Sequence, residues 1–364
     1  MENNSTIIDA LKDSFNDLQL NSYGVVDCYT SVSHEYDSLI QGVGIRDISH
    51  SKKIFIHGKE SINLINRLTT NNVSDLGELE WCRTIFTNSE GNIIDRTLLL
   101  KFEDYFLLVG SCPDSNKLRK WIERFIMSDD ITTSDVSTDY SMFEVMGPES
   151  ESYMSIILGD KLDQLQDKKI IRAQVENFFI HCVKYSELGN VDKYIVVVES
   201  KFANNMCHYF LNNASAFDLK FVGETAYNIF RIEQGIPVVP NELNDKFNPC
   251  EANLEDDLDT EKKGYIGCKQ IGDSSSKQNA GSRLTGFKFH DKLSDDSLSI
   301  TIHDDEGVKV GVITSIISSH LLEYSIGMGY VDSEIKHKEL MGINGTKKYK
   351  VTLTDFPIRG NLHR

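Results

Sequence analysis

The sequence predicts an α+β protein that ends in a small all-β domain. Between residues 51 and 127, strand-like alternation and helical spacing follow each other in the order β-α-β-β-β-α, which differs from a regular βαβ series. Beyond the polar run 273–281 the chain is β-like, and closure into a barrel or jelly roll would protect the strand edges. We expect five antiparallel strands there: 284–289, 298–303, 308–314, 322–330 and 348–354.

The length of 364 residues is enough for two or three domains, each with its own core. Hydrophobic residues make up 40% and charged residues 26% of the chain, which is typical of a globular protein and not of a disordered one. We predict four segments: a first α+β domain at 1–140, a second at 141–272, a linker at 273–281 and an all-β domain at 282–364.

The formal net charge of −17 disfavours a nucleic-acid or anionic-membrane partner, because both require a basic face. No window approaches 18 apolar residues, and the polar N-terminus lacks the pattern of a signal peptide. The seven cysteines form no CxxC pair, and no histidines have metal-ligand spacing. We therefore expect reduced thiols, no metal site and a cytoplasmic protein.

The first predicted domain begins with two amphipathic helices. Apolar residues recur at helical spacing over 5–20, and a second helix over 32–40 is entered from Ser31 or Ser33. The glycine-containing stretch 42–50 predicts a break after it. Strand and helix patterns then alternate around a hairpin: strand 51–57, helix 61–68, strand 105–110 and helix 114–127.

The second predicted domain has a similar order of elements without an exact sequence repeat. Its elements are strand 142–146, helix 149–158, strands 178–183 and 194–198, and helices 200–212 and 224–235. Pro237 and Pro240 force extended chain after the last helix. Residues 251–261 then hold six acids and no base, directly before Lys262.

The predicted hairpin of the first domain carries an aspartate, Asp95, just after its turn. Asn88–Asn92 is turn chemistry between the β-rich runs 84–86 and 97–100. Asp95 lies just past this turn, beside Ile93 and Ile94. It is either a solvated edge residue or a fixed anion aimed into a pocket, and the hairpin alone favours the solvated alternative.

Several segments, in order along the chain, resemble one protein family. The resemblance runs from about residue 20 to the end and is to the folate-binding aminomethyltransferase superfamily, typified by the T-protein of the glycine cleavage system. The segments that carry it are Gly44–His50, Arg67–Val73, Asn88–Asp95, Met146–Pro148, Arg231–Pro237, Tyr265–Gly267, Val310–Ser315 and Ile326–Val331.

This resemblance implies two ferredoxin-like, folate-binding α+β domains and a C-terminal barrel or jelly-roll-like domain around a central hole that holds tetrahydrofolate. Asp95 would then face the folate near N5 and N10, where a carboxylate can orient the reacting amines and offset developing positive charge. Arg231 and Glu233 either contact the ligand or form a buried ion pair that braces a helix end. The one-carbon donor would be a small molecule or a carrier-bound group, such as one on a lipoyl carrier protein.

The chain departs from the family pattern at positions around the predicted pocket. Asn92 and Arg96 replace a second glycine and a second aspartate of the turn. Asn190 falls where the family has a glutamate that grips the pterin, although Glu187 could substitute for it. Arg83 aligns with a tyrosine, and it is either a carboxylate clamp for the substrate or folate tail or a surface arginine on an edge strand.

We therefore expect a tetrahydrofolate-dependent transferase of aminomethyl or methyl groups. The alternative is a folate-binding accessory protein without transferase activity, related to the branch of the superfamily that maintains iron–sulfur cluster enzymes. That branch carries Lys-Gly-Cys-Tyr-x-Gly-Gln-Glu. The corresponding run here is Lys262–Lys269, in which Gly264 stands at the cysteine position and Cys268 lies four residues later.

Overall fold

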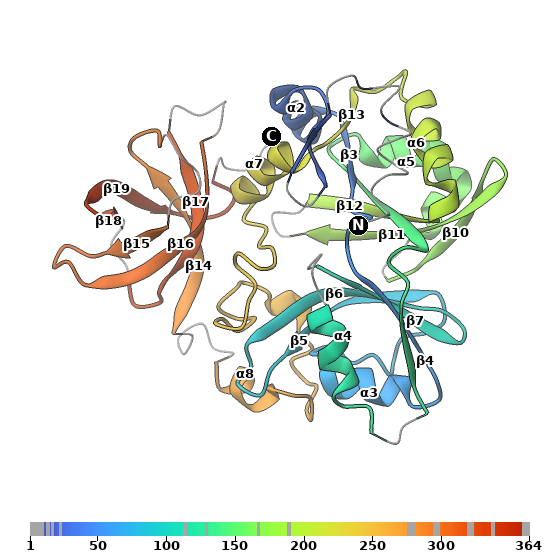
Figure 1. Cartoon of the computed structure of the whole chain (residues 1–364), viewed down its shortest axis with the longest axis horizontal. Coiled ribbons are helices and arrows are strands. Elements are labelled where there is room, and N and C mark those ends of the chain that lie inside the picture. The colour runs from blue at the N-terminus through green and yellow to red at the C-terminus, as the bar shows by residue number, and fades with distance from the viewer. Residues whose placement is uncertain are drawn as a thin grey trace. The chain divides into compact units, whose positions relative to one another are not determined.

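The computed structural model divides the chain into two compact units. The first unit comprises residues 1–64, 73–83 and 97–227, and the second comprises 65–72, 84–96 and 228–364. Each unit therefore joins segments that are distant in the sequence, as the colours of Figure 1 show. The structure describes residues 11, 15, 18–21, 24–111, 116–127, 130–165, 168–187, 191–274, 281–293, 299–318, 324–335 and 339–358.

A five-stranded sheet contains the predicted hairpin and has the strand order β5-β6-β7-β4-β8. Its strands are Lys53–His57 (β4), Glu80–Thr87 (β5), Ile93–Lys101 (β6), Tyr105–Gly110 (β7) and Thr132–Asp135 (β8). The helices that accompany it in sequence are Ser61–Leu68 (α3) and Asn116–Glu123 (α4). β8 was not predicted, because its four residues include no apolar side chain.

A six-stranded mixed sheet has the order β10-β11-β12-β9-β3-β13, in which only the β3–β13 pair is parallel among the described strands. Its strands are Val43–Asp47 (β3), Tyr140–Met146 (β9), Ile171–Val175 (β10), Phe178–Glu187 (β11), Val191–Glu199 (β12) and Leu219–Phe221 (β13). The helices of this part are Val32–Gln41 (α2), Ser150–Leu158 (α5), Ala203–Asn212 (α6) and Glu224–Gln234 (α7).

The predicted break of the helix is confirmed, because α2 ends at Gln41. Val43–Asp47 then forms β3, a strand that the sequence did not predict. Gly44 weakens the strand pattern, but the structure requires it for close packing: a Cβ there would lie 2.5 Å from Cδ2 of Leu39. The predicted helix before it is confirmed. Ser31 caps α2, and its side chain accepts a hydrogen bond from the N–H of His34.

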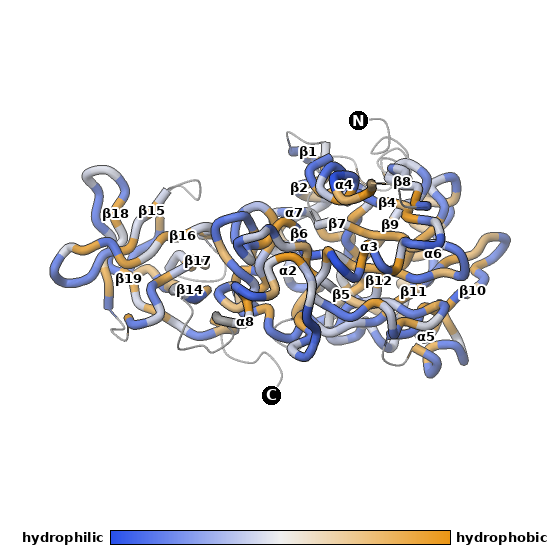
Figure 2. The backbone as a smooth tube through the Cα atoms, turned by 90° about the horizontal axis from the view of Figure 1, so that it is seen from below, coloured by the Kyte–Doolittle hydropathy of each residue, from blue (hydrophilic) through white to orange (hydrophobic). Residues whose placement is uncertain are grey.

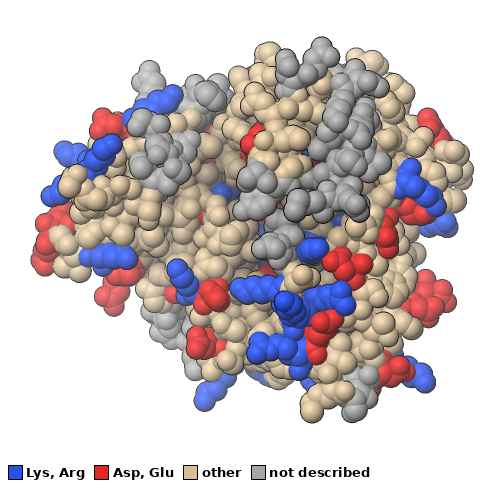
Figure 3. Space-filling model, in the orientation of Figure 1, with Lys and Arg blue, Asp and Glu red and all other residues tan. Residues whose placement is uncertain are grey.

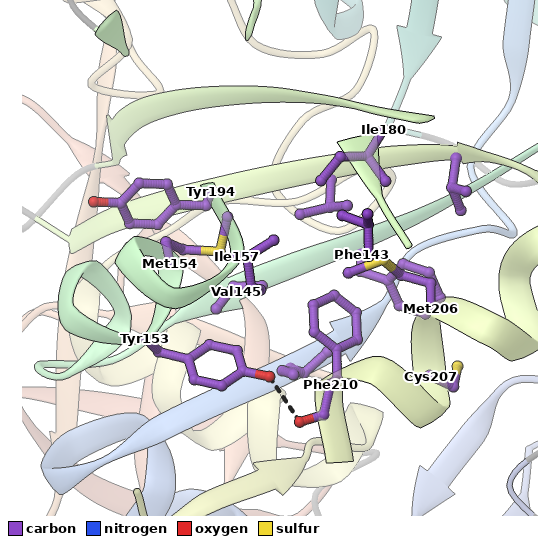
Figure 4. Close-up of a cluster of buried hydrophobic side chains, with 14 of the residues drawn as sticks. Phe143, Val145, Tyr153, Met154, Ile157, Ile180, Tyr194, Met206, Cys207 and Phe210 are labelled. Atoms are coloured by element: carbon purple, nitrogen blue, oxygen red, sulfur yellow. Dashed lines mark hydrogen bonds between the residues drawn. The ribbon is translucent and has the colours of Figure 1, made fainter. Parts of the chain in front are cut away.

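Both faces of the six-stranded sheet are covered in the first unit. On one face, Phe143 and Val145 of β9 pack against α5 and α6, and the Tyr153 hydroxyl donates a 2.7 Å hydrogen bond to the carbonyl of Phe210 (Figure 4). The other face packs against the five-stranded sheet. That second core includes Ile48, Trp81, Leu100, Leu107, Val109, Met142, Ile170, Val183, Ile195 and Val197. Because side chains alternate along a strand, Glu144 points to the same side as Met142.

A closed six-stranded barrel ends the second unit, in the order β14-β17-β16-β15-β18-β19. Its strands are Ser282–Phe289 (β14), Ile300–His303 (β15), Lys309–Ile317 (β16), Ile326–Asp332 (β17), Glu339–Asn344 (β18) and Lys347–Thr354 (β19). Figure 2 shows hydrophilic residues at the turns of the barrel and hydrophobic residues along β11 and β12 of the six-stranded sheet. β18 was not predicted, since Gly342 interrupts its short apolar run.

The predicted fold class, α+β with a C-terminal barrel, is confirmed. The predicted helix over 5–20 lies mostly outside the described residues, and the domain boundaries remain a prediction. None of the described helices combines the length and the apolar character that crossing a membrane requires. The remaining elements are Gln19–Leu20 (β1), Val26–Cys28 (β2), Cys268–Ser274 (α8) and the 3₁₀ turns Gly159–Gln164, Ser200–Phe202 and Glu255–Asp257.

Candidate functional site

The turn between β5 and β6 is fixed by its own polar side chain. The Asn88 side-chain oxygen accepts hydrogen bonds from the backbone N–H groups of Glu90 and Asn92, each at 2.9 Å. The N–H of Asn88 donates to the carbonyl of Asn92 at 2.9 Å, which closes the hairpin. The turn that precedes the strand of Asp95 is therefore held by its own hydrogen bonds.

This turn lies against the loop at the start of α8 in the second unit. Gly267 has a φ of +83°, and a Cβ on it would lie 2.6 Å from the carbonyl oxygen of Asn88. Gly91 has a φ of +82°, and a Cβ there would lie 3.1 Å from side-chain atoms of Gln270 and Ile271. The Tyr265–Gly267 landmark thus has a physical role, which is to let two backbones approach closely.

The altered position Asn92 also holds the hairpin in place. Its side-chain amide donates a 3.0 Å hydrogen bond to the carbonyl of Asp245, and the next N–H, of Ile93, donates to Phe247 at 2.9 Å. Asn92 therefore joins the turn to the segment after α7. Phe247 in turn stacks on Tyr330 of the barrel, with ring centroids 3.4 Å apart.

Asp95 is buried: only 1% of it is exposed. This excludes the solvated edge residue that the hairpin alone favoured. A carboxylate removed from water is retained in a protein when hydrogen bonds or charges compensate for its burial. Asp95 is thus a buried carboxyl group, and both its aim into a pocket and its contact with folate remain predictions.

Arg96 forms a buried ion pair with the acidic run noted in the sequence. Its Nε lies 2.6 Å from Oδ2 of Asp257, and the two residues are 7% and 3% exposed. The Thr70 hydroxyl donates to the backbone carbonyl of Asp257 at 3.1 Å. The cation that replaces an aspartate of the family turn is therefore neutralised within the second unit.

The end of the same acidic run is held by Lys262. Its Nζ donates hydrogen bonds to the carbonyls of Thr69 and Asn71, at 2.7 and 2.6 Å. Arg96 and Lys262 thus fix the segment between Asp257 and Lys262 at two points. One acid of this run, Asp257, thus pairs with the residue that follows Asp95 on β6.

Arg231 is engaged on three sides within the second unit. Its Nε donates to Asn228 at 2.7 Å, Nη1 to Glu242 at 3.0 Å and Nη2 to the Ser315 hydroxyl of the barrel at 2.9 Å. Glu242 is fully buried and also accepts hydrogen bonds from Thr314 and Ser315, both at 2.6 Å. This geometry matches the ion-pair alternative, but with Glu242 as the partner.

Glu233 lies two residues after Arg231 on α7 and is fully buried. Its backbone carbonyl accepts the N–H of Ile358 at 2.8 Å. Beyond it, Gly235 has a φ of +78°, and a Cβ there would lie 2.3 Å from the ring of Phe356. The role of Arg231 and Glu233 in cofactor binding remains a prediction.

Two predicted residues meet in the first unit. Nη1 of Arg83 lies 2.9 Å from Oε1 of Glu187, and Nη2 donates to the carbonyl of Ser186 at 3.3 Å. The guanidinium also lies 5.0 Å from the ring centroid of Tyr185. The Arg83 side chain is 18% exposed and that of Glu187 only 5%. Asn190 lies outside the described residues.

A row of polar side chains crosses four strands beside this pair, and the sequence interpretation missed it. Arg46 of β3 is opposite Glu144 of β9, and Lys193 of β12 is opposite Tyr185 of β11. Glu144 joins them, because Arg46, Lys193 and the Tyr185 hydroxyl lie 2.9, 3.4 and 3.3 Å from its carboxylate. The signal in the sequence was Glu144, the single charge inside the otherwise uncharged strand β9.

Charges within this row control one another. Burial raises the pKa of Glu144, but Lys193 and Arg46 outweigh that effect, so the pKa lies below its usual range. Burial lowers the pKa of Lys193, but Glu144 outweighs it and the pKa lies well above its usual value. Lys193 also donates to the Tyr227 hydroxyl at 3.0 Å. The row is therefore a set of charged and mutually paired side chains on one face of the six-stranded sheet.

Comparison with known proteins gives a consistent result. The family model "GCVT N-terminal domain" matches residues 18–262, and "Glycine cleavage T-protein C-terminal barrel domain" matches 283–358. An aminomethyltransferase of Thermoanaerobacter pseudethanolicus is 25% identical over 312 residues, covering 84% of this chain and 83% of its own. One of Clostridium botulinum (strain ATCC 19397 / Type A) is 25% identical over 336 residues, covering 87% and 88%.

A solved structure supports the fold. The glycine cleavage system aminomethyltransferase T from Bartonella henselae superposes with a TM-score of 0.82 at 18% identity, covering 97% of both chains. At that identity the likeness concerns the fold, whereas the two family models cover most of the sequence itself. The chain belongs to the glycine cleavage T-protein (aminomethyltransferase) family, with its N-terminal folate domain and its C-terminal barrel.

Proposed function

We propose that this protein binds tetrahydrofolate and transfers a one-carbon group, aminomethyl or methyl, to it. Family membership supports the ligand class, and the aminomethyltransferases that it resembles support the reaction class. The observation that carries the proposal is the burial of Asp95 on a preformed and well-anchored hairpin. The backbone that carries this acid is held in place, so binding of a ligand beside it would require little reorganisation of the hairpin.

The side chains present are chemically suited to tetrahydrofolate. Carboxylates accept the N–H groups of a pterin, and a guanidinium pairs with the carboxylates of a glutamate tail. Asp95 and Glu187 supply buried carboxylates, while Arg83 supplies a partly exposed guanidinium. We include Asn190, Arg231 and Glu233 as further contacts on the basis of the family resemblance.

Asp95 has the central role in this proposal. When bound, tetrahydrofolate supplies the amine that accepts the one-carbon unit. The Asp95 carboxylate orients that amine and offsets the positive charge that develops on it during transfer. Its negative charge performs this task, so an isosteric amide that keeps the shape of the side chain would lose most of the effect.

Two groups of donor fit the proposal. One is an aminomethyl group on a carrier such as the lipoyl carrier protein, and the other is a small molecule with a transferable methyl group. The printed names of the relatives favour the aminomethyl donor. We also propose a cytoplasmic setting, which accords with the free thiols of all described cysteines.

A transfer assay tests the proposal. The full chain is incubated with tetrahydrofolate and either aminomethylated lipoyl carrier protein or a methyl donor, and the one-carbon folate product is quantified. We expect product with the native chain and a loss of at least a hundredfold with Asp95→Ala. Folate binding without any transfer would favour the accessory protein of the iron–sulfur branch.

One observation weighs against that second candidate. The position of the branch's cysteine is held by Gly264, which has a φ of +82°. Residues other than glycine rarely adopt this backbone conformation, so a cysteine at position 264 would be strained. Cys268 lies four residues later, and its Sγ donates to the carbonyl of Lys262 at 3.7 Å.

A further inference from the structure

The barrel carries a cavity of about 360 Å³ on its outer surface, along strand β18. β18 lies between β15 and β19, and all three strands contribute to the lining (Figure 1). Leu340 and Val351 belong to the barrel core. Because side chains alternate along a strand, Met341 and Ile343 of β18 point outward, and both are half-buried. These two side chains give the cavity an apolar centre.

Strand register places charged side chains beside this centre. Met341 lies opposite His303 of β15 on one side and opposite Lys350 of β19 on the other. Ile343 lies opposite Lys348 of β19 in the same way. β15 and β19 are each one strand spacing from β18, so they lie roughly 10 Å apart. The two lysines therefore line the β19 side of the cavity.

Acidic side chains line the other side and one end of the cavity. Asp304 and Asp305 belong to the turn that follows β15, and Glu339 is the first residue of β18. One carboxylate oxygen of Asp304 accepts the N–H groups of Glu306 and Val308, at 3.0 and 2.8 Å, so part of its charge is used within the turn. The carboxylates of Asp305 and Glu339 are exposed. The cavity is therefore bipolar.

The opposite charges of the cavity do not neutralise one another. Within the described part of the chain, no ion pair is formed by its four exposed carboxylate and ammonium groups, those of Asp305, Glu339, Lys348 and Lys350. Figure 3 shows both acidic and basic side chains over the barrel. A ligand can pair with such groups without first breaking ion pairs within the protein, so less binding free energy is lost.

We propose that this cavity binds a small zwitterion whose ammonium and carboxylate groups lie roughly 10 Å apart at the two ends of an apolar body. A peptide of three residues with free termini has these properties, since each extended residue spans about 3.3–3.6 Å. Its ammonium group pairs with Asp305 and its carboxylate with Lys348 and Lys350. Its central side chain contacts Met341. This inference does not depend on the proposed transfer reaction.

The lining disfavours other ligands. Three acids against two lysines give no net attraction for a polyanion. The described residues contain no group of three or more His, Cys, Asp or Glu side chains able to hold a metal ion. Both ring nitrogens of His303 are already engaged, Nδ1 with the carbonyl of Gly307 and Nε2 with the hydroxyl of Thr301, each at 3.0 Å. A free α-amino acid carries both charges on one carbon and does not reach both sides.

Peptide binding to the full chain tests this site. Isothermal titration calorimetry compares the tripeptide Ala-Leu-Ala with its N-acetylated and C-amidated forms. We expect saturable binding of the free tripeptide and at least tenfold weaker binding of each blocked form, because each block removes one charge. Free leucine should also bind at least tenfold more weakly. No saturable binding of Ala-Leu-Ala up to about 10 mM, or equal binding of free and blocked peptides, would overturn the proposal.

Matched substitutions test the two ends of the cavity. Lys348→Gln removes a lysine that lines the cavity, whereas Lys347→Gln removes its exposed neighbour on β19, which does not. We expect the first to weaken binding of the free tripeptide about fivefold and the second less than about twofold. Asp305→Asn and Glu306→Gln form the corresponding acidic pair within one turn, with the same expectation. Equal effects within either pair would contradict the assignment of that end.

The changes in ligand and protein should also be coupled. Lys348→Gln is expected to have little effect on the C-amidated peptide and to retain its effect on the N-acetylated one, because only the latter keeps the carboxylate. Asp305→Asn should show the reverse pattern. The substituted side chains are exposed, so the fold should persist, and thermal unfolding of each variant checks this. The same loss with all three peptides would overturn the proposed orientation.

Discussion

The guanidinium of Arg83 lies 2.9 Å from the carboxylate of Glu187, although 104 residues separate them in the sequence. The buried member of this pair is the acid, and the partly exposed member is the arginine. The same guanidinium reaches the carbonyl of Ser186 and lies over the ring of Tyr185. Arg83 is therefore held by one strand, β11, through three different kinds of contact.

Arg83→Met is expected to lower the free energy of unfolding by about 1–3 kcal/mol, because it leaves Glu187 buried without its cation. Arg83→Lys should recover only part of this loss, since an ammonium cannot make the same set of contacts. Urea unfolding of the three chains measures the difference. Equal stability of the Met and Lys variants would show that the pair contributes little.

The buried pair of Arg96 and Asp257 should matter more. Arg96→Met and Asp257→Asn are each expected to lower the free energy of unfolding by about 3–5 kcal/mol, and the double variant should lose less than the sum. Arg119→Met breaks the exposed pair with Glu123 and is the control, with a loss below about 1 kcal/mol. Additive losses at Arg96 and Asp257 would contradict a direct pair.

The close approach of the Asn88 turn to the Tyr265–Gly267 loop can be tested with two glycines of equal φ. Gly264→Ala introduces only backbone strain, because no atom lies within 4 Å of the new Cβ, and should cost about 1 kcal/mol. Gly267→Ala adds a clash with the Asn88 carbonyl and should cost about 3 kcal/mol. Similar losses in thermal or chemical unfolding would mean that the turn can move away.

Lys53 gives the protein a defined pH dependence. It is fully buried and donates to the carbonyls of Ser49 and Ser51, both at 2.9 Å. Burial lowers its pKa from 10.5 to about 8, against the opposing effect of Asp47 and Asp135. Between about pH 8 and pH 10.5, Lys53 is protonated in the unfolded chain and largely neutral in the folded one. The unfolded chain therefore binds more protons there, so the contribution of Lys53 to stability increases as pH rises.

The size of this contribution is about 3 kcal/mol between pH 8 and pH 10.5. Other groups also titrate in this window, so the quantity to measure is the difference between the native chain and Lys53→Met. We expect the native chain to gain stability relative to the variant as pH rises. A constant difference would show that Lys53 has the same pKa in both states.

Local sequence signals predicted the hairpin, the cap of α2 and most barrel strands, because turn residues and periodicity act over a few positions. Asp95 was singled out, but its hairpin contacts Asp245 and Gly267, which sequence spacing does not reveal. The pairing of Arg83 with Glu187 could not be predicted either. Long-range partners are chosen by the tertiary fold, and each of these charges is equally plausible at a surface.

The polar row on the six-stranded sheet is a second case in which the sequence does not reveal long-range partners. Glu144 interrupts an otherwise uncharged strand, so the sequence carries a visible signal of buried charge there, whereas Lys193 precedes the apolar run of β12. It does not show that the two strands are neighbours, which is what brings the charges together. Strand β3 was not predicted either, since a glycine that packing requires, such as Gly44, resembles one that interrupts a strand.

Tetrahydrofolate binding tests the central claim most directly. Anaerobic titration calorimetry of the full chain is expected to give saturable binding of one tetrahydrofolate, and ligand at a hundredfold excess over Kd should stabilise the fold by about 2.7 kcal/mol. Asp95→Asn should bind at least tenfold more weakly while still unfolding cooperatively. No saturable binding to the native chain, or equal binding by both chains, would contradict the account.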